Sequence, residues 1–311
     1  MFNRNVIGLC IAFWSGLAAP VQRGDHRSTS GVLTWLWLLL LLGLFWQQAS
    51  GQPLVFAPLP LENPSLTQMR NQPLADLLAQ LLQRPVEMRL CRDHACLIDA
   101  LAQGEIDLAE LGPLPYLLAR DRLPALQPVV SVRESDGQAS YRCVLVAPVD
   151  GLQSLAPLAS PDSPPKVAFT RAESTCGPSA SFWLLAEHGV EPASIAATYA
   201  GGHDEVALAV LRQLFSLGGV KDSVARRFHG LGLRVLATSE PMPGFVLAAR
   251  LERLTHAELA RLRTTLMQLP DMQRDRLQSG RAGFTDFDAS LFEQVETMRA
   301  FSAPYLQRIA P

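Results

Sequence analysis

The sequence predicts an α/β protein with two lobes, and three observations carry that prediction. Predicted strands alternate with predicted helices over residues 54–111, and the same alternation restarts over 166–238. The two series are joined by two extended segments, near 140–147 and 244–250, rather than by a single linker. Strand and helix alternation implies a mostly parallel sheet that helices cover on both faces. We therefore expect two lobes, with crossing strands between them.

The elements of the first series follow from apolar spacing and from glycine and proline. A short apolar run opens the series, and leucines at helical spacing follow it. Gly104 ends the second helix, and Gly112 and Pro113 follow the third strand. The expected elements are strands over 54–59, 86–91 and 106–111, helices over 65–82 and 94–103, extended runs over 126–133 and 141–147, and a loop rich in Pro and Ser over 151–165.

The second series is predicted in the same way. Its expected elements are strands over 166–170, 194–200, 217–220 and 233–238, helices over 177–188 and 205–215, and an extended run over 245–250. The remainder, 254–310, is expected to be mainly helical, with breaks at Pro270 and around 280–286. No repeat of fixed period is visible, which excludes solenoids and propellers.

Composition and charge exclude several classes of function. The 311 residues are 48% hydrophobic and 18% charged, which is typical of a globular protein with a sizeable core. The 27 Lys plus Arg and 29 Asp plus Glu give a net charge of −2, without any run of five like charges, so no nucleic-acid partner is expected. Five cysteines without a CxxC pair favour neither a disulfide scaffold nor a zinc ribbon nor a thioredoxin-like site.

The N-terminal segment has the anatomy of a signal peptide. Residues 32–46 are nearly all apolar, Arg23 and Arg27 precede them, and the small residues 49–51 follow. A helix of this length covers about 22 Å, short of the ~30 Å hydrocarbon core, so a stable membrane anchor is the weaker alternative. We expect 1–52 to be a cleaved leader and the protein to be secreted.

The strongest local signal for a binding site lies within residues 169–178. This segment places Ser174, Thr175 and Cys176 between a predicted strand and the N-terminus of a predicted helix. Free N–H groups and the partial positive charge of a helix N-terminus, with hydroxyls beside them, make an anion site. Simple N-capping by Ser174 or Thr175 is the alternative interpretation.

Three further loops follow predicted strands, at the strand ends where open α/β sheets bind ligands. His203 comes after Ala200-Gly-Gly, where the glycines allow close backbone approach and the imidazole can donate to an oxyanion. A structural or solvated histidine is the alternative. Tyr116 follows the third strand and can face a cleft or pack on its own lobe, and residues 57–63 follow the first strand.

Taken in order, these segments resemble the periplasmic substrate-binding proteins of phosphate, phosphite and phosphonate ABC transporters. The resemblance covers about 54–250 and rests on five motifs: Pro58-Leu-Pro-Leu-Glu-Asn63, Asn71-Gln-Pro-Leu-Ala-Asp76, Gly104-Glu-Ile-Asp-Leu-Ala-Glu-Leu-Gly-Pro-Leu-Pro-Tyr116, Glu173-Ser-Thr-Cys-Gly177 and Gly201-Gly-His-Asp-Glu-Val-Ala207.

The resemblance implies a two-lobed, periplasmic-binding-protein-like fold of type 2, in which two mixed sheets are flanked by helices and a two-strand hinge joins the lobes. It implies one lobe from 53–140 plus 247–311 and a second from 141–246. A small oxyanion would bind in the cleft through Tyr116, Ser174, Thr175, Cys176 and His203. The expected partner is an ABC permease, which would be the protein's only link to the membrane. The expected location is the periplasm, and no cofactor, metal or catalytic residue is expected.

The chain departs from this family at two places. Cys176 stands where a third hydroxyl is usual, and a thiol is a weaker donor. Near the short strand over 217–220, Ser216 lies about where a phosphonate binder has an acid, with Lys221 and Asp222 just beyond. An aminoalkylphosphonate is therefore not favoured as the ligand.

Three other interpretations use the same residues. Cys176 at a helix N-terminus, with His203 nearby, is the pattern of a thiol-dependent enzyme. Cys91, His94 and Cys96 could ligate a metal, but a short-loop disulfide or two packed thiols is the preferred interpretation of the cysteines. The third alternative is an anion-sensing module that acts on a membrane kinase.

Overall fold

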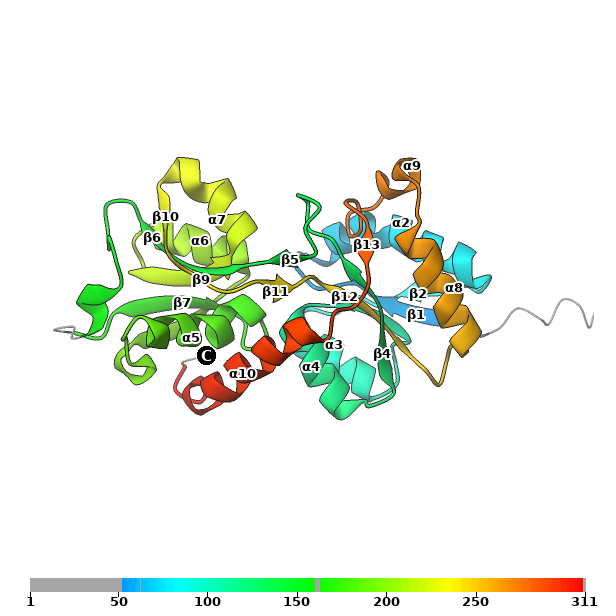
Figure 1. Cartoon of the computed structure of the whole chain (residues 1–311), viewed down its shortest axis with the longest axis horizontal. Coiled ribbons are helices and arrows are strands. Elements are labelled where there is room, and N and C mark those ends of the chain that lie inside the picture. Colours follow the sequence, from blue (N-terminus) through cyan, green and yellow to red (C-terminus); the bar gives the residue numbers. More distant parts are fainter. Residues whose placement is uncertain (1–51, 62, 160–162, 310–311) are drawn as a thin grey trace, which may run out of the picture. The chain divides into compact units, whose positions relative to one another are not determined.

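Two mixed β-sheets organise the part of the chain that the computed structural model describes, residues 52–61, 63–159 and 163–309 (Figure 1). We call the part built on the six-stranded sheet the first lobe and the part built on the five-stranded sheet the second lobe. The predicted leader lies outside the described residues up to residue 51, so its cleavage stays a prediction. No described helix combines the length and the hydropathy that crossing a bilayer requires.

The sheet of the first lobe has the strand order β13-β4-β12-β3-β1-β2. Strands β1, β2 and β3 are parallel, while β12 runs antiparallel to β3 and β4. Helices α2 and α8 pack on one face of this sheet, and α3, α4 and α10 pack on the other. The elements are β1 (Leu54–Ala57), α2 (Pro64–Leu82), β2 (Val86–Met88), α3 (His94–Ala102), β3 (Leu108–Leu111), α4 (Pro113–Arg122), β4 (Leu126–Val132), β12 (Val246–Arg250), α8 (His256–Met267), α9 (Asp271–Arg274), β13 (Phe284–Thr285) and α10 (Ser290–Leu306).

The sheet of the second lobe has the strand order β10-β6-β9-β7-β8. Strand β7 is parallel to β8 and β9, and β6 is antiparallel to β9 and β10. Helix α5 covers one face, and α6 and α7 cover the other. The elements are β6 (Cys143–Pro148), η1 (Ala156–Ala159), β7 (Lys166–Thr170), η2 (Thr175–Ser179), α5 (Ala180–Glu187), η3 (Pro192–Ser194), β8 (Ala196–Gly201), α6 (His203–Leu211), β9 (Leu217–Lys221), α7 (Asp222–Phe228), η4 (His229–Leu231) and β10 (Leu233–Thr238).

Two short strands form the hinge between the lobes. Strands β5 (Ser140–Tyr141) and β11 (Met242–Pro243) pair antiparallel, one on each segment that crosses between the lobes. The two mixed sheets and the crossing segments confirm the predicted fold class. Helix α10 packs against α4 of the first lobe and α5 of the second, and Phe301 and Tyr305 stack with Trp183 and Phe182 of α5. The predicted lobe boundaries stay a prediction, because this tail contacts both lobes.

Helix α4 is the clearest difference from the sequence-based expectation, which placed only a Gly-Pro break after the third strand. Pro113 stands at the start of the helix, where the missing N–H costs nothing and the fixed φ suits the first turn. Helix α7 was also missed, since it has only seven residues and no strong apolar period. The sheets are mixed rather than mostly parallel, because the crossing segments add antiparallel strands.

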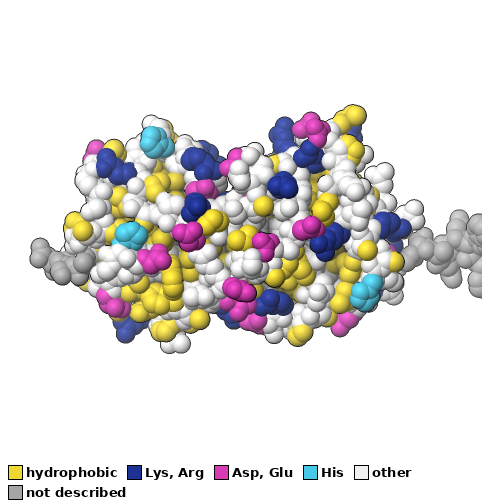
Figure 2. Space-filling model, in the orientation of Figure 1, with side chains coloured by type: hydrophobic (Ala, Val, Ile, Leu, Met, Phe, Trp, Pro, Cys, Tyr) yellow, Lys and Arg dark blue, Asp and Glu magenta, His cyan; other side chains and the backbone are white. Residues whose placement is uncertain are grey.

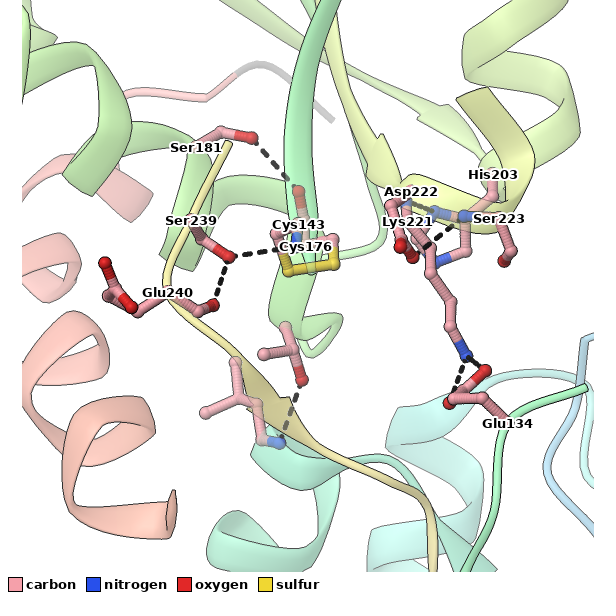
Figure 3. Close-up of a disulfide and its surroundings, with 12 residues drawn as sticks. Glu134, Cys143, Cys176, Ser181, His203, Lys221, Asp222, Ser223, Ser239 and Glu240 are labelled. Atoms are coloured by element: carbon pink, nitrogen blue, oxygen red, sulfur yellow. Dashed lines mark hydrogen bonds and ion pairs between the residues drawn. A yellow bond between two sulfur atoms is a disulfide. The ribbon is translucent and has the colours of Figure 1, made fainter. Parts of the chain in front are cut away.

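A disulfide fixes the turn η2 to the sheet of the second lobe. Cys176 in η2 is bonded to Cys143 at the start of β6 (Figure 3). The Cys143 N–H donates to Ser239 Oγ, and Ser181 Oγ donates to the Cys176 carbonyl, both at 3.0 Å. A Cβ on Gly219 of β9 would lie 2.6 Å from the Cys176 carbonyl oxygen, so only glycine lets the turn lie this close to the sheet.

An ion pair joins the lobes. Lys221 Nζ, at the end of β9 in the second lobe, lies 2.7 Å from both carboxylate oxygens of Glu134, which follows β4 of the first lobe (Figure 3). The two side chains are only 12% and 14% exposed. The same ammonium lies 4.3 Å from the ring centre of Tyr141 and 4.6 Å from that of Phe245, one on each crossing segment. Lys221 therefore combines an ion pair with two cation–π contacts.

The Cys143–Cys176 disulfide should stabilise the fold by restricting the unfolded chain. With a sequence separation of 33 between the two cysteines, the double substitution Cys143→Ala/Cys176→Ala should cost about 3–4 kcal/mol of unfolding free energy, measured by urea titration. Dithiothreitol should produce the same loss in the wild-type protein and none in the double variant. Equal midpoints for the oxidised wild type and the double variant would contradict this role.

The second stability prediction concerns the ion pair between Lys221 and Glu134. Glu134→Gln leaves a poorly exposed ammonium without its carboxylate and should cost about 3 kcal/mol in urea unfolding. The matched control is Glu296→Gln, which breaks an ion pair with Arg120 whose side chains are 39% and 49% exposed and should cost at most ~1 kcal/mol. Similar losses in the two variants would show that the Lys221 pair is an ordinary surface contact.

Candidate functional site

The turn after β7 places Ser174 at the N-terminal end of η2, which continues into α5. Ser174 is buried, and its side chain makes no capping hydrogen bond. The N-capping role that we weighed for Ser174 is therefore not used. A buried hydroxyl at the start of a helical segment is available as a donor to a bound anion.

Thr175 has a structural role between the lobes. Its hydroxyl accepts a hydrogen bond from the Leu114 N–H, 3.0 Å away at the N-terminus of α4, and it is hydrogen-bonded to the Tyr141 side chain. Burial raises the pKa of the Tyr141 hydroxyl, which stays protonated at all physiological pH values. The Thr175 hydroxyl thus has two protein partners, one in the first lobe and one in the hinge.

Cys176 carries no free thiol in this structure, because its sulfur is bonded to Cys143. The S–H donor and the thiolate nucleophile that the sequence suggested both require a thiol at this position. Only the backbone of Cys176 is left to contact a ligand.

Tyr116 lies in the hydrophobic core. It is 2% exposed, and its ring meets Phe287 and Phe292 edge-on at centre distances of 5.5 and 5.3 Å. Its hydroxyl is hydrogen-bonded to Arg120, and burial raises its pKa. These contacts make Tyr116 part of the packing between α4 and α10, and its role as a ligand contact stays a prediction.

His203 begins α6 directly after two glycines. Gly201 has a φ of +107°, a conformation that suits glycine and turns the chain sharply into the helix. His203 Nδ1 accepts a hydrogen bond of 3.2 Å from the backbone N–H of Lys221. Burial, followed by the charge of Lys221, lowers the pKa of His203 to about 3, so the ring is neutral at pH 7. The neutral ring then carries its proton on Nε2, which can donate to an oxyanion.

His94 of the first lobe lies near enough to His203 for its charge to act on that ring, and sequence analysis considered His94 only as a metal ligand. It is the first residue of α3, is 8% exposed, and has no hydrogen-bond partner at either ring nitrogen. Burial and the guanidinium of Arg171 lower the pKa of His94 to about 4, while Asp93 opposes that shift. The charge of a protonated His94 also lowers the pKa of His203. Two imidazoles from opposite lobes therefore lie close enough to act on each other.

Arg171 completes the cluster. It follows β7 directly, and its guanidinium donates to the Pro60 carbonyl of the first lobe at 3.4 Å. Thr170, the last residue of β7, has a buried hydroxyl without a hydrogen-bond partner. We call His94, Thr170, Arg171, Ser174 and His203 the donor cluster. His94 and Arg171 follow the same strand-end rule that identified Ser174 and His203, so that rule could have found them.

A cavity of about 580 Å³ lies mostly in the first lobe and reaches Lys221 of the second, and its lining includes no residue of the donor cluster. Its lining includes Glu110 of β3, whose carboxyl accepts a hydrogen bond from Ser279 and whose pKa is raised by burial. Charges of both signs line it, namely Arg70, Arg133, Lys221 and Arg281 with Glu110, Glu134 and Asp275. This mixture does not select for an anion. On the face shown in Figure 2, basic and acidic side chains are likewise intermixed.

Cys91 and Cys96 are free thiols that hydrogen-bond to each other, which agrees with the packed-thiol interpretation. Burial raises the pKa of Cys91 to about 12, so that thiol is not activated. Across the described residues, no three or more His, Cys, Asp or Glu side chains are grouped so as to hold a metal ion.

The family comparison covers most of the chain. Residues 56–294 match the family described as "ABC transporter, phosphonate, periplasmic substrate-binding protein". A curated relative, the phosphate-import protein PhnD of Mycolicibacterium smegmatis, is 30% identical over 178 residues, which are 52% of this chain and 53% of that protein. The chain thus matches about half the length of this relative.

Solved structures share the fold. PhnD1 from Prochlorococcus marinus, in complex with methylphosphonate, superposes with a TM-score of 0.69 at 16% identity over 80% of this chain and 98% of that one. A binding protein component of an ABC phosphonate transporter from Pseudomonas aeruginosa gives a TM-score of 0.68 at 19% identity over 81% and 87%. At these identities the likeness concerns the fold.

The family match, which covers most of the chain, shows that this protein belongs to the periplasmic substrate-binding proteins of phosphonate ABC transporters, a family of transporter components rather than enzymes.

Proposed function

We propose that this protein captures a small oxyanion of the phosphate, phosphite or phosphonate class between its lobes and delivers it to an ABC permease. The observation that carries the proposal is the buried imidazole of His94, which lacks a partner at both ring nitrogens and lies close enough to Arg171 and His203 of the other lobe for their charges to interact. A buried polar group without a partner costs about 1–3 kcal/mol. An oxyanion placed between these residues would remove that cost.

The chemistry of the donor cluster favours an anion over a cation. Arg171 carries a fixed positive charge, and His203 can donate from Nε2. The Thr170 hydroxyl is buried without a hydrogen-bond partner, and the Ser174 side chain makes no capping hydrogen bond. Asp93, the nearest acid to His94, accepts the hydrogen bond of the Cys96 N–H at the start of α3. A tetrahedral oxyanion has several acceptors, and it can bind donors that arrive from both lobes.

The relatives support the class of ligand. Methylphosphonate is bound in the structure of PhnD1, and the curated relative is a phosphate-import protein. Lys221 argues further against an aminoalkylphosphonate, because its positive charge acts on His203 and would repel a second ammonium placed there. Transport would follow from closure, since a ligand that contacts both lobes favours the closed arrangement.

The proposal includes no catalytic step. The thiol-dependent alternative required a nucleophile at Cys176, where the sulfur forms a disulfide. Secretion to the periplasm is part of the proposal and fits the family and the predicted leader.

Ligand binding can be tested by thermal shift with phosphate, phosphite, methylphosphonate and sulfate. A ligand at 100 times its dissociation constant should stabilise the protein by ~2.7 kcal/mol. Ser174→Ala should bind the active ligand roughly tenfold to hundredfold more weakly, equivalent to ~1–3 kcal/mol, because it removes one donor to a buried charge. Its own fold should be unaffected, because Ser174 makes no capping bond.

The matched control for that test is Ser194→Ala. Ser194 donates to the Glu191 carbonyl in a turn of the second lobe, outside the donor cluster, and its loss should leave the affinity unchanged. If none of the four anions raises the melting temperature, or if Ser174→Ala and Ser194→Ala bind equally well, the proposed site is wrong.

A further inference from the structure

We propose that the protein takes up a proton together with its oxyanion and that His94 holds this proton in the complex. The inference rests on the proposed function, since it concerns the same donor cluster. Its consequence is a ligand affinity that increases as the pH falls.

The first argument is the number of donors. A neutral imidazole has one N–H and one lone pair, whereas an imidazolium has two N–H donors. His94 has two buried ring nitrogens without a partner, in a place where acceptors arrive with the ligand. A neutral ring has one N–H, so it donates from only one of its nitrogens and keeps a buried lone pair at the other. Protonation turns that nitrogen into a second donor.

The second argument is the change of charge around His94. Without ligand, the charged or titratable groups that act on this ring are Arg171 and Asp93, and the ring in turn acts on His203. Burial and Arg171 then hold the pKa near 4, which keeps His94 neutral over the range in which the protein would work. A bound oxyanion neutralises Arg171 and attracts an imidazolium, so it raises the pKa of His94.

His203 differs from His94 in one contact. Its Nδ1 already accepts the Lys221 N–H, and a proton on Nδ1 would break this hydrogen bond. Lys221, Arg227 and His94 add positive charge around the His203 ring and oppose its protonation. His203 therefore donates Nε2–H as a neutral ring, and the extra proton belongs to His94.

The sign of the pH dependence follows from linkage. Between the pKa of His94 in the free protein and its higher pKa in the complex, the complex binds one more proton than its components. Within that window each unit of decrease in pH should increase the affinity by up to about tenfold. Above the window the His94 contribution disappears.

The test is isothermal titration calorimetry with methylphosphonate, in buffers of different ionisation enthalpy, at pH 5 to 8. The enthalpy difference between buffers gives the number of protons taken up. Methylphosphonate itself titrates, but the protonation state of the free ligand at a given pH is the same for every variant. Wild type should take up as much as one proton more than His94→Gln, which keeps one amide donor but cannot become charged. His203→Gln should bind more weakly yet retain the wild-type proton uptake.

His188→Gln is the matched control, because His188 is exposed and its Nδ1 is hydrogen-bonded to the Leu184 carbonyl. It should change neither affinity nor proton uptake. Equal proton uptake by wild type and His94→Gln, with both binding methylphosphonate, would overturn the proton-linked role and leave the binding function intact. Absence of binding by the wild type to methylphosphonate and to the other anions would instead remove the function itself.

A second measurement covers the case in which His94→Gln does not bind. The ring proton signals of the wild-type histidines can be followed by NMR across the same pH range, with and without saturating methylphosphonate. The His94 pKa should rise on binding by more than that of any other histidine. An unchanged His94 pKa in the complex would reject the inference.

Discussion

The two lobes and the candidate site both depend on Lys221. Its ammonium is paired with Glu134 of the first lobe and lies against an aromatic ring on each crossing segment. Its backbone N–H holds His203 Nδ1 and so decides which nitrogen of that ring can donate. One residue at the end of β9 therefore links the two lobes, contacts both crossing segments and fixes the tautomer of a candidate ligand contact. A second anchor, the Cys143–Cys176 disulfide, fixes the turn that carries Ser174 to the same sheet.

The donor cluster lowers the free energy of unfolding of the ligand-free protein. Buried polar groups are nearly always hydrogen-bonded, yet His94 and Thr170 are not. These two groups hold fixed positions in the free protein because they belong to secondary-structure elements, namely the start of α3 and the end of β7. A ligand that satisfies them gains their lost hydrogen bonds without having to order a loop. In the proposed function, the same residues that lower the stability of the free protein would raise its affinity for an anion.

Much of the fold was predictable from the sequence, because alternation of strands and helices is a strong local pattern. The two crossing segments were also visible, since they interrupt that pattern twice. Helix α4 was not predicted, because Pro113 is a breaker inside a helix but a good first residue. The sequence left open whether Cys143 pairs with Cys176 or Cys91 with Cys96, because the fold, and not sequence spacing, brings β6 beside η2.

The site was predictable only in part. Ser174 and His203 stand where hydroxyl or glycine signals precede a helix. His94 obeys the same rule, but the flanking Cys91 and Cys96 suggested metal chemistry instead. Tyr116 has a similar place in sequence, and its burial against Phe287 and Phe292 comes from α10, far along the chain. Tertiary packing therefore buries Tyr116 in a way that its place in the sequence does not indicate, and its role as a ligand contact stays a prediction.

The most direct test of the account is the position of the phosphorus atom in crystals grown with methylphosphonate, located by its anomalous scattering. The account predicts phosphorus between the lobes, with phosphonate oxygens within about 3.2 Å of a His94 ring nitrogen and of His203 Nε2. Phosphorus in the neighbouring cavity beside Glu110 and Ser279, with both imidazoles out of contact, would contradict it.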